Sequence, residues 1–255
     1  TVREVRESAL AYYQAQQRAV TKEDYIVRAY SLPAKYGNIA KVHLVQDDQL
    51  NKSTGTDELE RLVTQADVDN ERTIKSLQVR TPNPLAMNMY TLGFDANKKL
   101  SSLNQTVKEN LKTYLSQYRL VTDAVNIKDA YVINIAVNFA ILTKSEFAKN
   151  EVLLKCVAAI KDFFDIDRWQ IGQPIVLSDI AYELSLVDGV ASVVPPVDSD
   201  TVIKIENKYK AGEGYSGNFY DIKNSMIDGV LYPALDPSIF EIKYPNTDIK
   251  GKVVG

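Results

Sequence analysis

Two side chains of this sequence have the chemistry for nucleophilic catalysis. The chain holds one histidine, His43, and one cysteine, Cys156. A Ser/His/Asp or Cys/His site would need His43, which lies between Val42 and Leu44 on a predicted strand, the pattern of a sheet histidine. Cys156 lies in an apolar helical stretch, which favours a buried small hydrophobic residue over a reactive thiol. The sequence therefore predicts no nucleophilic site.

Glycine-rich and acidic clusters are the remaining candidates for chemistry. The segment 212–217 carries three glycines, but no buried strand precedes it and no helix follows, which indicates a turn rather than a phosphate loop. Two acidic clusters lack the spacing and the glycine of an EF-hand loop: Asp162, Asp165 and Asp167, and Asp198 with Asp200. We expect no metal, no cofactor and no enzymatic activity. A glycosidase-type acid pair stays open, because distance in space defines such a pair.

Composition narrows the class of protein further. The chain has 255 residues, a formal net charge of −3 and one cysteine, which excludes an intrachain disulfide and a multi-cysteine zinc site. Its sequence pI of about 5.4 does not favour general nucleic-acid binding. No apolar run is long enough for a membrane-spanning helix, so we expect no membrane insertion. The first residues are already helical in pattern, so we expect a fragment or a processed chain.

The first part of the chain reads as a small module of helices and strands. Periodicity predicts helices over 1–17 and 22–32, the second begun by Thr21, and strands over 39–45, 77–79 and 85–94. Ser102 and Gln105 form a capping box ahead of another helix. Residues 47–75 hold eight acids, four bases and no aromatics, which predicts a solvated acidic excursion, mobile or docked.

The clearest strand pattern of the sequence covers residues 131–141. Apolar residues alternate along one face, whereas Asn134 and Asn138 interrupt the other. Thr143 and Glu146 form a capping box for a helix to about residue 164, which we expect to cover one side of the sheet. A shorter helix begun by Ser178 and a strand over 190–194 complete this second module.

Residues 197–255 are rich in glycine, proline and aromatic residues. Short strands are predicted at 201–206, 230–232 and 240–244, but none is long enough to build its own core. The aromatic side chains, together with Trp169, are candidates for an interface, because aromatic residues are frequent binding hot spots. The candidate interface residues are Trp169, Tyr209, Tyr215, Phe219, Tyr220, Tyr232, Phe240 and Tyr244. The alternative is that this tail covers its own second module.

The predicted fold class is α/β of the α+β type, in three parts. Residues 1–127 form a first module with the acidic excursion at 47–75. Residues 128–196 form a second β-α-α-β module, and residues 197–255 form an extended tail.

Two stretches of the chain resemble the baseplate J-like family. The first, at 19–45, contains Ala-Val-Thr-Lys-Glu-Asp-Tyr and then Gly-Asn-Ile-Ala-Lys-Val from Gly37. The second, at 128–194, contains Ile-Gly-Gln-Pro-Ile-Val-Leu-Ser from Ile171 and Val-Asp-Gly-Val-Ala-Ser-Val from Val187. The long aromatic tail is most similar to the T-even-type branch of the family.

The resemblance implies a structural role in a virion. Members of this family form the wedges of contractile phage tails and related injection machines, as rings that rearrange on tail contraction. It implies a homodimer or a ring, other baseplate wedge proteins as partners, assembly in the host cytoplasm and no catalytic residues. A small-molecule-binding α/β module and a hydrolase with an acidic pair are the alternatives; a deep pocket or a carboxylate of raised pKa in a cleft would favour them.

Overall fold

The computed structural model confirms the α+β class. It describes residue 6 and residues 18–46, 86–120, 122–196, 201–234 and 237–254. The chain divides into two compact units, which are Thr1–Phe94 with Ser101–Asp129, and Asp95–Leu100 with Ala130–Gly255. The helix expected at 1–17, the acidic excursion 47–75 and the strand expected at 77–79 lie outside the described ranges, apart from residue 6. Within the described ranges, no helix has the length and apolarity to cross a bilayer.

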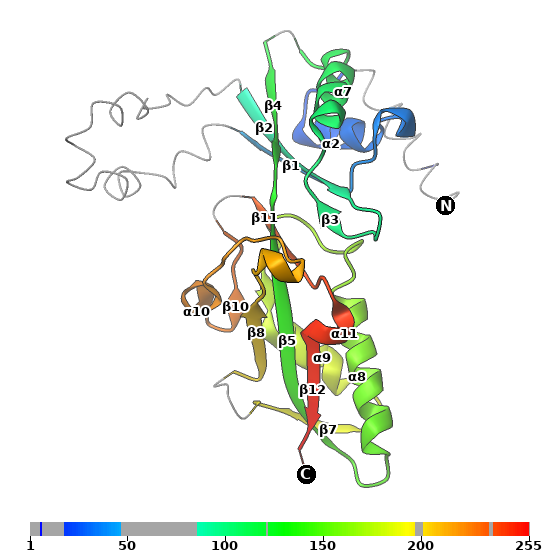
Figure 1. Ribbon diagram of the computed structural model, residues 1–255, viewed down its shortest axis with the longest axis vertical. Coiled ribbons are helices and arrows are strands. Elements are labelled where there is room, and N and C mark those ends of the chain that lie inside the picture. The colour runs from blue at the N-terminus through cyan, green and yellow to red at the C-terminus, as the bar shows by residue number, and fades with distance from the viewer. Residues whose placement is uncertain are drawn as a thin grey trace, which may run out of the picture. The chain divides into compact units, whose positions relative to one another are not determined.

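The first unit places two helices on a small mixed sheet (Figure 1). β2 is antiparallel to β1 and parallel to β4, while α2 packs on β1 and α7 on β4. The elements of this region are α2 (Lys22–Tyr30), η1 (Ala34–Tyr36), β1 (Lys41–Gln46), β2 (Ala86–Phe94), β3 (Leu100–Ser101), α7 (Gln105–Ser116) and β4 (Ala124–Asp129).

The capping pattern predicted at Thr21 is confirmed. Its hydroxyl accepts the Asp24 N–H, and the Asp24 carboxylate accepts the N–H of Thr21 in return. This reciprocal pair fixes the start of α2 and directs Tyr25 inward. The fully buried Tyr25 donates its hydroxyl to Asp123 at 2.8 Å. The Thr21 cap and the buried Tyr25 side chain therefore both position α2.

Three predicted helix starts are wrong by two to five residues. α7 is capped by Asn104 rather than Ser102, because the N–H of Leu103 is taken by the Asp129 carboxylate at 3.3 Å. Thr143 cannot cap a helix, because it is the last residue of a strand, and the helix begins at Lys149. Ser178 lies inside its helix, which begins one residue earlier.

Strand β5 (Tyr131–Thr143) is the centre of the second unit. Its lower half pairs with β7 on one edge and β12 on the other, and its upper half with β8 and β11 (Figure 1). The partners are β7 (Val190–Val194), β8 (Ile203–Asn207), β11 (Ser238–Glu241) and β12 (Ile249–Val253). The two edges of β5 therefore form hydrogen bonds with four other strands.

Three of those four partners come from the segment that the sequence presents as an extended tail. β8 is antiparallel to β5, whereas β11 and β12 are parallel to it. Three strands of the segment 197–255 are thus built into the sheet of the second unit. The reason is that β5 is buried on both faces, so its backbone groups need partners on both edges, which its own helices cannot supply.

Helices cover the face of β5 that carries Phe139. Gly251 of β12 is in register with Phe139, and a Cβ at Gly251 would clash with the Phe139 ring and with Leu153 of α8. Phe139 and Leu153 therefore meet over Gly251, and a glycine there permits the close approach. The two helices of this layer are α8 (Lys149–Phe163) and α9 (Leu177–Ser185).

Smaller elements complete the second unit. A three-stranded sheet joins β6 to β10 and β10 to β9, all antiparallel. These elements are β6 (Ile175–Val176), η2 (Ala211–Glu213), α10 (Ile222–Ser225), β9 (Met226–Ile227), β10 (Val230–Leu231) and α11 (Pro245–Asp248).

We predict that Val137→Asp unfolds the second unit. Val137 is fully buried on β5, between β8 and β12, so the carboxylate would enter the core without a partner. Thermal unfolding followed by near-ultraviolet circular dichroism measures the effect. Ser192→Asp, at an exposed position of β7, is the matched control and should melt like the parent. A native melting temperature for Val137→Asp would contradict the placement.

Candidate functional site

The side chains considered for catalysis are not assembled into a site. His43 is half-buried on β1, and burial together with the Lys22 charge lowers its pKa. Cys156 is fully buried, and burial raises the pKa of its thiol to about 11, so it is protonated at neutral pH. Neither residue has the environment of an activated nucleophile.

The first acidic cluster forms local contacts, an ion pair and a hydrogen bond. Asp162 forms an ion pair with Arg168 at 3.2 Å, and Asp165 accepts the N–H of Asp167. Asp198 and Asp200 lie outside the described residues. In the parts of the chain that the structure describes, no group of three or more His, Cys, Asp and Glu side chains is placed to hold a metal ion.

The candidate interface residues differ widely in exposure. Trp169 and Phe240 are core residues, at 4% and 1% exposure, and Tyr215 and Tyr220 are half-buried. The exposed members are Tyr209 at 44%, Phe219 at 69%, Tyr232 at 48% and Tyr244 at 40%. The candidates thus separate into packing residues and surface residues.

Two of the exposed aromatic side chains pack against each other in a fixed geometry. The rings of Tyr209 and Phe219 meet edge to face, with centroids 5.2 Å apart. Their loop is tied to the sheet, because the Asn218 amide donates to the carbonyl of Val132 at 2.8 Å. The Tyr209–Phe219 pair is therefore a fixed apolar projection on the second unit.

A polar network holds this loop and the neighbouring strand β11 on β5. The Oδ1 of Asn134 accepts the Ser216 N–H at 2.8 Å, and its Nδ2 donates to the Oε2 of Glu241 at 2.9 Å. The Oε1 of Glu241 accepts the N–H of Leu100 at 3.0 Å. We name these four residues the Asn134 network.

The buried carboxylate of Glu241 ends this chain of donors. Glu241 is 3% exposed, and burial raises the pKa of its carboxyl above the ordinary value. Both oxygens accept hydrogen bonds, so a group that can only accept fits this position. Those bonds, with the charges of Lys99 and Lys243, oppose the effect of burial. The raised pKa of Glu241 is thus a consequence of its burial in a structural position.

A second buried carboxylate fixes the loop from the other side. Asp248 is 2% exposed; its Oδ1 accepts the Tyr215 hydroxyl at 2.7 Å, and its Oδ2 accepts the Tyr244 N–H at 2.9 Å. Burial and the bond to Asp248 raise the pKa of Tyr215. Tyr215 and Tyr244, whose rings are 5.4 Å apart, therefore support the loop.

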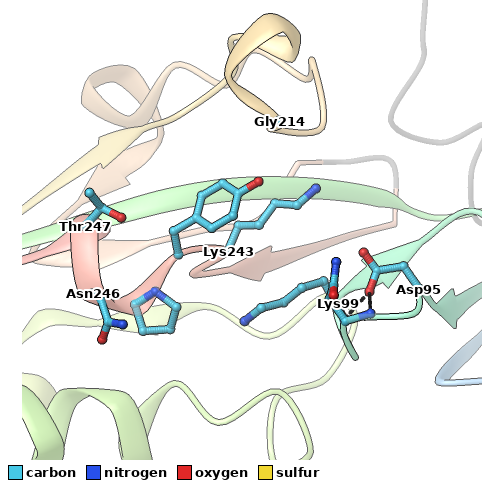
Figure 2. A pocket seen from close by; sticks show the side chains of 9 residues that line it. Asp95, Lys99, Gly214, Lys243, Asn246 and Thr247 are labelled. Carbon is cyan, nitrogen blue, oxygen red and sulfur yellow. Dashed lines mark hydrogen bonds between the residues drawn. The ribbon is translucent and has the colours of Figure 1, made fainter.

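An open cavity of about 550 Å³ lies beside this loop (Figure 2). Lys99 and Lys243 line it together with Tyr244 and Asp95. The Oδ1 of Asp95 accepts two backbone N–H groups, those of Asn97 and Lys99, so Asp95 maintains a turn. The cavity offers cationic side chains but no base or nucleophile aimed at a common point.

The Asn134 network was missed at the level of sequence. Asn134 interrupts an otherwise apolar face, and this signal marks a buried polar position. Its partners are more than 80 residues away in the chain: Ser216 and Glu241. Local periodicity cannot show such a pairing.

Comparison with known proteins gives a match of fold. No family model matches the sequence, and no curated protein matches it. Fifteen chains of solved structures match. One belongs to the "Cryo-EM structure of the anti-feeding prophage (AFP) baseplate, 6-fold symmetrised", with a TM-score of 0.51 and 11% sequence identity over 94% of this chain. The present chain spans 42% of that chain's length. At this identity the likeness shows a shared fold.

We predict that Asn134→Leu destabilises the second unit more than Asn138→Leu does. Asn134→Leu leaves the Ser216 N–H and one oxygen of the buried Glu241 without these partners, and the buried oxygen alone costs about 1–3 kcal/mol. Asn138 is on the same strand and face, and its Oδ1 has no hydrogen-bond partner among the described residues. Urea unfolding of both variants measures the difference. Equal losses would contradict the network.

Glu241 and Glu206 should influence the pH dependence of stability with opposite signs. The folded-state pKa of Glu241 is raised above its ordinary 4.5, so its contribution is greatest below that value and is lost as the pH rises through the folded pKa. The Lys204 hydrogen bond lowers the pKa of Glu206, so its contribution is present above the ordinary pKa and is lost in acid. Stability differences between the parent and Glu241→Gln, and between the parent and Glu206→Gln, should slope oppositely from pH 4 to 7 in urea titrations. Parallel slopes would show that the burial of Glu241 is misplaced.

Proposed function

We propose that this chain is a structural component of a contractile-tail baseplate wedge. The observation that carries the proposal is the fold likeness to a chain of the AFP baseplate over 94% of this chain. The resemblance of residues 19–45 and 128–194 to the baseplate J-like family supports it independently. The aromatic tail resembles that of the baseplate wedge protein of T-even-type phages.

The arrangement of the side chains supports a binding role over a catalytic one. Where the structure describes the chain, buried carboxylates such as Glu241 and Asp248 hold loops against a sheet. Large aromatic side chains such as Phe219 and Tyr209 are exposed, and fixed aromatic groups are favoured at interfaces. These features are expected of a protein that works by association.

The Tyr209–Phe219 pair is the surface we propose for that association. Phe219 is 69% exposed, and its ring is already oriented by Tyr209 and by the Asn218 bond to β5. Preset rings lose little conformational entropy on binding, so more of their contact energy contributes to affinity. Tyr232, at 48% exposure, adds to the aromatic surface of the same segment.

The partners we propose are other copies of the chain and other wedge proteins. In this proposal the copies associate as dimers or in a ring around the tail hub, and the ring rearranges when the tail contracts. The location is the baseplate of the virion, after assembly in the host cytoplasm. The strands β8, β11 and β12 cover the body while the Tyr209–Phe219 pair stays exposed, so the two roles considered for the tail are compatible.

Two other classes of function have less support. A small-molecule-binding module would need an enclosed apolar pocket, whereas the cavity beside Lys99 and Lys243 is open and cationic. A hydrolase would need a carboxylate of raised pKa free to act, whereas both oxygens of Glu241 accept hydrogen bonds.

Sedimentation velocity tests the proposal, with the chain alone and mixed with tail proteins from the same source. The parent should form a dimer, a ring or a mixed complex. Tyr209→Ser with Phe219→Ser should weaken that association about thirtyfold, the effect of removing a hot spot. Tyr182→Ser with Leu186→Ser removes a comparably exposed pair, at 62% and 59%, and is the control.

The outcomes test the baseplate role and the proposed binding surface separately. A parent chain that stays monomeric and binds no tail protein would contradict the baseplate role. Association that both double variants weaken equally would contradict the assignment of the Tyr209–Phe219 pair.

A further inference from the structure

A groove of about 390 Å³ lies between α8 and α9, on the helical layer of the second unit. Its lining combines apolar side chains with three carboxylates and one cation, Arg168. The lining includes Phe163, Trp169, Pro174, Asp162, Asp179 and Glu183. This volume is in the range of sites that hold a few residues of a ligand.

The indole of Trp169 carries an unpaired donor in the wall of this groove. Trp169 is 4% exposed, and its ring packs against Phe163 and Phe164 with centroids 5.8 and 5.3 Å away. Its Nε1 is buried and has no hydrogen-bond partner among the described residues. A buried N–H without an acceptor costs about 1–3 kcal/mol, so an acceptor that reaches the indole once the lining side chains shift gains this energy.

The lining of the groove carries excess negative charge. Asp179 and Glu183 are one helical turn apart on α9, both exposed, and neither forms an ion pair within the described ranges. Like charges at this spacing destabilise a helix. Asp162 differs, because it pairs with Arg168. The carboxylates of Asp179 and Glu183 can thus pair with a cationic partner.

We propose that the groove, here named the Trp169 groove, binds a basic peptide segment of a partner protein. A backbone carbonyl of the segment accepts the Trp169 N–H after a small shift of the lining side chains. An apolar side chain of the segment lies against Phe163 and Pro174, and a lysine or arginine pairs with Asp179 and Glu183. The groove is separate from the Tyr209–Phe219 pair, so this proposal does not depend on the baseplate role.

The charge of the groove selects the class of ligand. Anionic ligands would be repelled by Asp179 and Glu183, and a purely apolar ligand would leave the indole donor unpaired. A basic peptide satisfies both groups at once. Ionic strength should weaken the binding, because the carboxylates are exposed to solvent.

The single tryptophan of the chain makes the test direct. The indole N–H gives one cross-peak in a ¹H–¹⁵N correlation spectrum, and that peak reports on this groove alone. The probe is the peptide acetyl-Leu-Arg-Leu-Arg-amide, titrated into the full chain at low salt. The expected result is a saturable downfield shift of the indole peak, with no shift from acetyl-Leu-Glu-Leu-Glu-amide.

Variants then assign the contacts through the anisotropy of a dye-labelled form of the basic peptide. Trp169→Phe keeps the aromatic packing but removes the donor, and should weaken binding about two- to tenfold. Asp179→Lys with Glu183→Lys should abolish it. Glu146→Lys with Glu151→Lys makes the same charge change at exposed positions outside the groove and should leave binding within about twofold of the parent, as expected for distant sites.

Three results would overturn the proposal. They are an indole peak that does not move with the basic peptide, equal binding of the acidic peptide, and parental affinity in the Asp179→Lys with Glu183→Lys variant. The last variant keeps the test decisive if Trp169→Phe fails to fold, because Asp179 and Glu183 are exposed.

Discussion

Hydrogen bonding of β5 along both of its edges is the constraint on which the second unit depends. A strand of thirteen residues that is buried on both faces must pair every backbone N–H and C=O group. The chain meets this demand with β7 and β8 on one edge and with β11 and β12 on the other. The segment after residue 200 therefore returns to β5 three times, and the loops between those returns carry the exposed aromatic residues.

The same constraint explains the buried polar groups. β11 and β12 run parallel to β5 and pair with successive parts of it, and α11 lies in the connection between them. Asp248 at the end of α11 accepts the N–H of Tyr244 within that connection, and Glu241 at the end of β11 accepts the N–H of Leu100. Burial of two carboxylates is costly, but each has hydrogen-bond donors, which is the condition for a buried charge in a stable fold.

Local elements could be predicted from the sequence, and long-range pairings could not. The alternation of 131–141 and the turn before Val190 are local patterns, and β5 and β7 follow them closely. The predicted start of α7 is wrong because the distant Asp129 carboxylate accepts the N–H of Leu103, and that of α8 is wrong because β5 continues to Thr143. The tail was read as extended because its strands are four or five residues long, too short to show a period of two. The candidate aromatics were found by type, but the burial of Phe240 and Trp169 depends on packing that type cannot reveal.

Amide hydrogen exchange of the full chain tests most directly that the tail is built into the sheet of β5. The pairing of Gly251 with Phe139 and of Ile205 with Val137 predicts that the amides of β8 and β12 are protected to the same extent as those of β5. Protection should be lost together for all three strands as urea is added, since they form one cooperative unit. Fast exchange in β8 and β12 beside a protected β5 would contradict the account.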